Sequence, residues 1–130
     1  MLAAPMASAG LAAQNASLPS KTYRFEDLPV RTSGNNRFRP ILEGVTHQGY
    51  RIEMHGSDLA PGGTPHPAHR HAHEEVFLVR EGALEVTIGG RSSQLGPGSV
   101  AFIGSNDEHG IRNAGTTHAE YFVIALGSDK

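Results

Sequence analysis

Short apolar runs alternate with turn residues along most of this chain. Residues 84–88 (LEVTI) place an apolar side chain at every second position, which is the period of a β-strand with one buried face. The Gly89-Gly90 pair that follows predicts a two-residue hairpin turn, with a return strand over residues 92–95. Counted along the chain, about eight to ten short strands recur at regular spacing, which indicates an all-β sandwich or barrel with Greek-key connections.

Two runs are apolar at consecutive rather than alternate positions, namely residues 76–79 (VFLV) and 121–126 (YFVIAL). A strand with one face in water would alternate, so both runs predict a sheet that is covered on its outer face as well. We expect a second copy of the chain to provide that cover, because two-fold dimers are the commonest oligomers. The pattern therefore predicts a homodimer.

The chain divides into three parts. Residues 1–20 are rich in Ala and carry no charge, residues 21–39 are predicted to be an extended arm with strand-like Tyr23 and Phe25, and residues 40–130 form the main domain. A polar turn is expected at residues 33–36. Two strands are expected next, with Tyr50, Ile52 and Met54 on one face, before a turn at residues 59–63.

Residues 1–20 have two interpretations. Ala7-Ser8-Ala9 fits the small-x-small pattern before the cleavage site of an export signal, although a basic start is missing. A truncated signal would predict an exported or periplasmic protein, whereas a disordered Ala-rich tail would predict a cytoplasmic one. No stretch has the ~20 apolar residues of a membrane span, so membrane insertion is not expected.

Composition limits the partners and ligands. The 130 residues suit one domain, and a formal net charge of −2 without a basic run argues against nucleic acid. The absence of Cys excludes disulfides and thiolate ligands. The chain has eight His, six of which lie in or near one candidate site: His55, His66, His69, His71, His73 and His109.

The stretch from Gly63 to Gly82 contains the pattern of a metal site. It spaces His69, His71 and Glu75 so that all three side chains would point the same way from an alternating strand. Imidazole and carboxylate ligands together suit a first-row transition ion. A later apolar segment carries His109, a candidate fourth ligand.

These residues resemble the two sequence motifs of the cupin superfamily. The first, G-x5-H-x-H-x3-E-x6-G, is matched at every position from Gly63 to Gly82. The second, G-x5-P-x-G-x2-H-x3-N, is matched at Gly98, His109 and Asn113, whereas Gly104 and Asn106 replace its Pro and central Gly. Asn tolerates the left-handed turn conformation that a Gly would serve.

The resemblance covers roughly residues 40–126 and implies a double-stranded β-helix, or jelly-roll barrel. It also implies one divalent metal ion bound by His69, His71, Glu75 and His109. These ligands suit Mn, Fe, Ni, Zn, Cu or Co. Four protein ligands leave two open positions in octahedral coordination, where substrate or dioxygen could bind.

Other polar residues lie near the motifs. His73 is also at an odd-numbered position, so its side chain could lie beside the ligands and carry protons or replace a ligand. It could instead be solvated. Glu75 is a second candidate for proton transfer. We expect a surface position for His66. His55 could reach the cavity from the arriving strand, although an ordinary sheet position is expected. Asn113 is expected to hold the turn after His109.

Three functions are compatible with this pattern. The first is a small metalloenzyme of the oxidoreductase or dioxygenase type acting on an oxygenated small molecule. The second is a metal-dependent isomerase, hydrolase or decarboxylase. The third is a non-catalytic module that binds a small ligand or the metal itself. Because one fold serves many reactions, the site has to distinguish among them.

Overall fold

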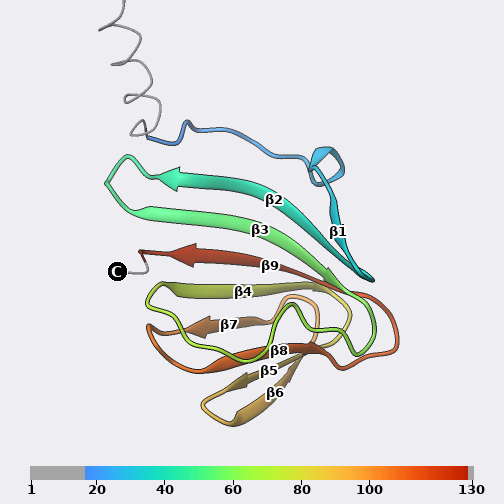
Figure 1. Ribbon diagram of the computed structural model, residues 1–130. Helices are drawn as coiled ribbons and strands as arrows, with labels where there is room; N and C mark the ends of the chain where they lie inside the picture. The colour runs from blue at the N-terminus through green and yellow to red at the C-terminus, as the bar shows by residue number, and fades with distance from the viewer. Residues whose placement is uncertain (1–16, 129–130) are drawn as a thin grey trace, which may run out of the picture.

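Two antiparallel sheets make up the protein, which is described by a computed structural model over residues 17–128 (Figure 1). The larger sheet has the strand order β1-β2-β3-β9-β4-β7 and the smaller β6-β5-β8. The strands are β1 (Arg31–Ser33), β2 (Asn36–Val45), β3 (Arg51–Leu59), β4 (Glu74–Glu81), β5 (Leu84–Ile88), β6 (Arg91–Leu95), β7 (Val100–Ile103), β8 (His109–Asn113) and β9 (Ala119–Leu126). Nine strands in the described chain confirm the predicted number.

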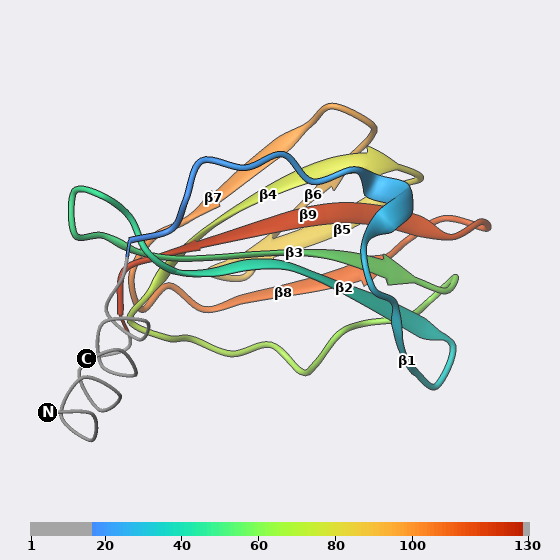
Figure 2. The same ribbon diagram turned by 90° about the horizontal axis from the view of Figure 1, so that it is seen from above.

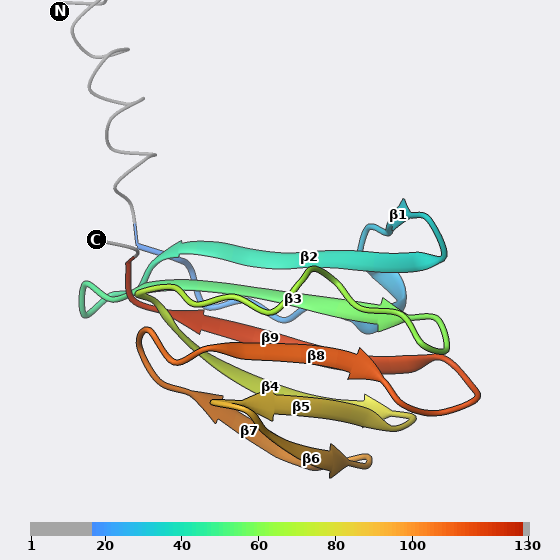
Figure 3. The same ribbon diagram turned by 60° about the horizontal axis from the view of Figure 1, so that its bottom comes forward.

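The order of strands in the large sheet differs from their order in the chain. The last strand, β9, lies between β3 and β4, so that His55 pairs with Val123 and Val123 with Phe77. The small sheet lies in front of β9, β4 and β7 (Figure 3). This arrangement is the predicted jelly roll.

The core lies between the two sheets. Leu84 and Val86 of β5 are buried, as their alternation predicted, and Ile88 packs against the core at its edge. The large sheet contributes Phe77, Val79, Tyr121 and others from every second position. The inward face of β4 and β9 is therefore the core face.

The prediction for the arm was partly wrong. Phe25 lies in a short 3-10 helix, η1 (Phe25–Asp27), rather than in a strand. Its ring meets Phe122 edge-on at a centroid distance of 6.3 Å, because the arm crosses the outer face of the large sheet, opposite the 60–73 loop (Figure 2). The polar turn at residues 33–36 joins β1 to β2 as predicted. Tyr50 lies outside β3 and is exposed.

The arm leaves part of the outer face uncovered. Leu78, Val100 and Phe102 point outward from β4 and β7, and Phe102 is 57% exposed. The cover predicted for this face is therefore absent from residues 17–128 of a single chain. Within the same residues no helix is long and apolar enough to cross a membrane. The export-signal pattern of residues 7–9 lies outside the described residues.

Candidate metal centre and adjoining cavity

His69 and His71 lie in the loop before β4, and only Glu75 lies on a strand. The alternating-strand argument for these three residues was therefore wrong, although the side chains still converge. Backbone hydrogen bonds hold the loop in place: His69 and His109 exchange both N–H···O bonds, at 3.0 and 2.9 Å. The Asn106 N–H donates to the His71 carbonyl at 2.7 Å.

Donor atoms from the loop, β4 and β8 meet at one point. The distance from Glu75 Oε1 is 3.2 Å to His71 Nε2 and 3.2 Å to His109 Nε2. Nitrogens of His69, His71 and His109 lie within 4.8 Å of one another. Two donors that are each about 2.1 Å from an ion lie about 3 Å apart at right angles, so this spacing fits shared coordination of a single ion.

Hydrogen bonds on the far side of two imidazoles select the nitrogen that faces this point. His71 Nδ1 donates to the His73 carbonyl at 2.8 Å, and His109 Nδ1 donates to the Asp107 carbonyl at 2.9 Å. Each Nε2 is then left with a lone pair, which is how metal-binding histidines are usually oriented. His109 Nε2 is buried and has no hydrogen-bond partner in the described residues. A metal ion would satisfy it.

The pKa of His69 lies below the usual value for histidine. Burial of the ring is the largest cause, and the neighbouring His66, His109 and His71 act in the same direction. Its ring stacks on His66, with centroids 3.9 Å apart. His69 is therefore held in the neutral form that binds metal.

His73 is next to the cluster. Its ring is parallel to that of His71 at 3.7 Å, and its Nε2 is 3.6 Å from Glu75 Oε2. His71, His73 and Glu75 form a second group of potential ligands. His73 faces a hollow that Glu43 and Glu53 also line.

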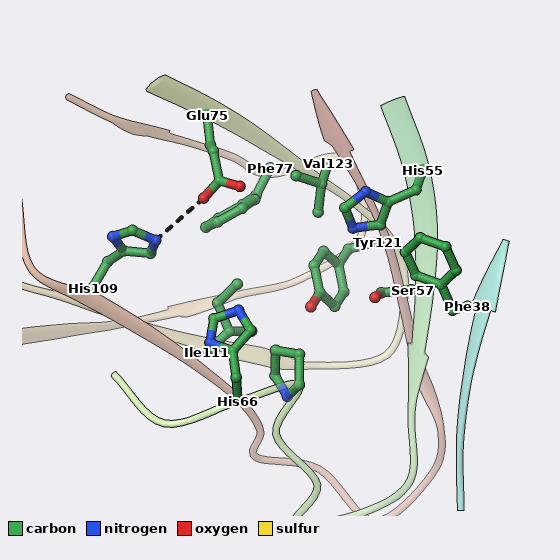
Figure 4. A pocket seen from close by; sticks show the side chains of 11 residues that line it. Phe38, His55, Ser57, His66, Glu75, Phe77, His109, Ile111, Tyr121 and Val123 are labelled. Carbon is green, nitrogen blue, oxygen red and sulfur yellow. Dashed lines mark ion pairs between the residues drawn. The ribbon is translucent and has the colours of Figure 1, made fainter. Parts of the chain in front are cut away.

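A cavity of about 290 Å³ adjoins the metal ligands inside the barrel (Figure 4). Glu75 and His109 form part of its wall, so a ligand in the cavity would reach the site. The remaining lining residues are Phe38, His55, Ser57, Pro65, His66, Phe77, Ile111, Tyr121 and Val123. His66 is exposed, as expected, and also borders this cavity, whereas His55 lies on β3 and reaches the cavity, the less favoured of its two expected positions.

Tyr121 is a cavity residue that the sequence analysis missed. It is 2% exposed, and burial raises its pKa to about 12 although a hydrogen bond with the Ser57 side chain opposes the shift. It therefore presents a neutral phenol to the cavity. Its position between apolar residues of one strand was the only signal for an inward hydroxyl.

One departure from the second motif, Asn106, is accommodated, and the matching Asn113 holds its turn. Asn106 has a φ of 63°, the left-handed conformation expected where Asn replaces Gly. Asn113 is fully buried and donates to the Leu59 and Thr117 carbonyls, both at 2.8 Å. The Gly115 N–H donates to its side-chain oxygen. The predicted role of Asn113 in holding this turn is confirmed.

Comparison with known proteins identifies similar sequences and folds. A sequence model described as Cupin domain matches residues 57–125. No curated protein matches the sequence. Many solved structures do match, at low sequence identity.

Three of these structures indicate the range of proteins with this fold. An RmlC-like cupin from Shewanella frigidimarina is 19% identical with a TM-score of 0.68, covering 85% of this chain and 95% of its own. The polyketide cyclase RemF from Streptomyces resistomycificus is 20% identical with a TM-score of 0.67, covering 85% and 81%. A predicted oxalate decarboxylase from Thermotoga maritima is 19% identical with a TM-score of 0.68, covering 83% and 100%.

Proposed function

This chain belongs to the cupin superfamily, and from that premise we propose that it is a metal-dependent enzyme of the oxidoreductase or dioxygenase type acting on a small oxygenated molecule. The observation that carries the proposal is the buried Nε2 of His109, which lies beside the cavity, 3.2 Å from Glu75 Oε1, and has no hydrogen-bond partner among the described residues. An unpaired buried polar atom is costly, so a ligand is needed there.

Each side chain has a distinct part in this proposal. His69, His71, Glu75 and His109 would hold one divalent transition ion, which supplies Lewis acidity and, if it is redox-active, electrons for oxygen chemistry. The apolar wall at Phe77 would shield one side of a bound substrate from water. Because Glu75 is used as a ligand, proton transfer falls to another residue.

The first test is elemental analysis of untagged protein. The wild type should contain one transition ion per chain, and a His71→Ala, His109→Ala double variant none, because two of the four donors are lost. His47→Ala, which alters an exposed histidine away from the cluster, is the matched control and should keep the ion. Oxygen uptake with small hydroxylated compounds then tests the reaction type. A wild type that takes up none of the six candidate metals would contradict the proposal.

A second candidate is a metal-dependent isomerase, hydrolase or decarboxylase. Two structures of similar fold are described as a polyketide cyclase and a predicted oxalate decarboxylase, and the neutral phenol of Tyr121 could donate a proton in such a reaction. Turnover by zinc-loaded protein without oxygen would favour this candidate. Turnover that requires oxygen would favour the first.

We also propose that the protein is a homodimer that buries the uncovered outer face. Leu78, Val100 and Phe102 form a patch there, and they are 38–57% exposed. Contiguous exposed apolar side chains usually mark an interface. The pairing of Leu78 with Val100 across β4 and β7 makes the patch continuous.

A further inference from the structure

His55, a residue outside the metal-ligand cluster, lines the same cavity and is paired with Glu53, which lies beside the cavity rather than in its wall. His55 on β3 directs Nδ1 at the carboxylate of Glu53, at 2.8 and 3.0 Å from its two oxygens. We propose that His55 and Glu53 are a dyad that takes a proton from the hydroxyl group of a small, uncharged ring compound bound in the cavity. This inference deepens the proposed function, because it gives that site a proton acceptor and a ligand class.

The contacts of His55 leave one nitrogen for the cavity. A carboxylate only accepts hydrogen bonds, so Nδ1 carries a proton, and in the neutral imidazole Nε2 then has the lone pair. The ring packs on Phe38 at a centroid distance of 4.6 Å, which fixes its plane. In Figure 4 the His55 ring is directed into the cavity that Glu75 and His109 also line. Nε2 is thus the nitrogen available to a ligand.

Strand geometry explains why the dyad faces inward. Glu53, His55 and Ser57 occupy alternate positions of β3 and therefore point to the same side of the sheet, where His55 and Ser57 line the cavity and Glu53 lies beside it. The His55 side chain is 19% exposed and that of Glu53 29% exposed, so both are partly sheltered from water. A base oriented by a carboxylate is a recurring arrangement for accepting a hydroxyl proton.

The cavity wall restricts the class of ligand. None of the described residues that line it is Lys or Arg, which phosphates and multiple carboxylates would need. Phe38, Phe77, Ile111 and Val123 supply flat and branched apolar surface instead. The volume of about 290 Å³ is at the small end for ligand sites. A single ring with a phenol or enol hydroxyl fits this description.

The proton transfer balances without a further reactant. The ligand O–H bond breaks, its electron pair stays on oxygen, and the proton joins Nε2. The resulting imidazolium is stabilised by the Glu53 carboxylate, and the Tyr121 phenol can donate a hydrogen bond to the new oxyanion. The charged or titratable groups around His55 are Glu53 on its own strand, Tyr121, Glu75, His109, His66, Arg31 and Glu43.

The test uses 4-nitrophenol, whose anion absorbs visible light, as the cavity probe. Spectra of the bound probe are recorded across pH in zinc-loaded and metal-free wild type, His55→Gln and Glu53→Gln. The midpoint pH at which the bound probe ionises should rise by about 1–3 pH units in His55→Gln and by less in Glu53→Gln, since the stabilising cation is lost or weakened. His47→Gln should match the wild type. Zinc content and circular dichroism should be equal in all variants.

Each alternative outcome has a separate meaning. Equal ionisation midpoints in His55→Gln and wild type would overturn the dyad. Failure of the folded wild type to bind the probe would overturn the ligand class. A protein that binds no metal but keeps the difference between His55→Gln and wild type would contradict the proposed metalloenzyme and uphold the dyad.

Discussion

At the scale of single residues, Tyr121 links the cavity to the pH dependence of stability. Its pKa is about 12 in the folded protein and about 10 in an unfolded chain. Between these values the unfolded state loses a proton that the folded state keeps, so rising pH favours unfolding. The contribution is complete below pH 10 and is lost as the pH approaches 12.

We therefore predict that the free energy of unfolding falls between pH 10 and pH 12, with Tyr121 contributing up to about 3 kcal/mol of the loss. Urea titrations at several pH values measure this fall. In Tyr121→Phe the fall should be smaller by that amount. An identical pH dependence in the variant would show that the phenol has an ordinary pKa.

Asn106 and His55 show which properties of a single residue can be predicted from the sequence and which cannot. The left-handed φ of Asn106 could be predicted, because few side chains other than Gly, Asn and Asp adopt it. For His55, the sequence left a cavity position and an ordinary sheet position open. Its strand period allows two opposite faces, and the choice depends on which strands lie beside β3.

At the scale of elements, the turn between β4 and β5 depends on Gly82. Its φ is 81°, and a Cβ at this position would lie 2.6 Å from the His118 carbonyl oxygen and 2.8 Å from Ala119 Cα. Gly90, in the β5–β6 turn, has a φ of 82° with no atom within 4 Å of an added Cβ. Comparing substitutions at Gly82 and Gly90 therefore distinguishes the cost of backbone strain from the cost of a steric clash.

We predict that Gly90→Ala costs about 1–2 kcal/mol of stability through backbone strain alone. Gly82→Ala should cost about 1–3 kcal/mol more, because neighbouring backbone must move to admit the methyl group. Chemical denaturation of both variants measures the difference. Equal losses would show that the strands next to Gly82 shift at no cost.

The loop that carries His69 and His71 shows why element type was harder to predict than ligand identity. The spacing of the ligands is the same in a strand and in an extended loop. The loop has one isolated bridge, between His69 and His109, rather than a ladder of strand partners. Pro65 and Pro67 lack the N–H that a ladder requires.

At the scale of the whole molecule, the uncovered outer face predicts that the protein forms a homodimer. Val100→Ser combined with Phe102→Ser should convert the proposed dimer to a monomer, because both side chains are more than half exposed in the single chain. Light scattering after size exclusion should give twice the chain mass of 13.8 kDa for the wild type and the chain mass for the variant.

The control for this prediction removes comparable apolar surface elsewhere. Val30→Ser with Tyr50→Ser alters residues that are 49% and 65% exposed and lie outside the patch, and it should leave the mass unchanged. A monomeric wild type at micromolar concentration would contradict the dimer. A monomeric result would not contradict the fold of the single chain, since the patch lies on the side of the sheet opposite the core.

The sequence alone determined the strand content, the jelly roll and the candidate ligand set. These follow from local patterns: the two-residue period, the turn residues, and motifs whose spacing is read along one chain. The tertiary structure decided that β9 lies between β3 and β4, which places Ser57, His55 and Tyr121 around one cavity with Glu75. Strand pairing between distant segments depends on packing across the whole core, and no local pattern encodes which neighbour is chosen.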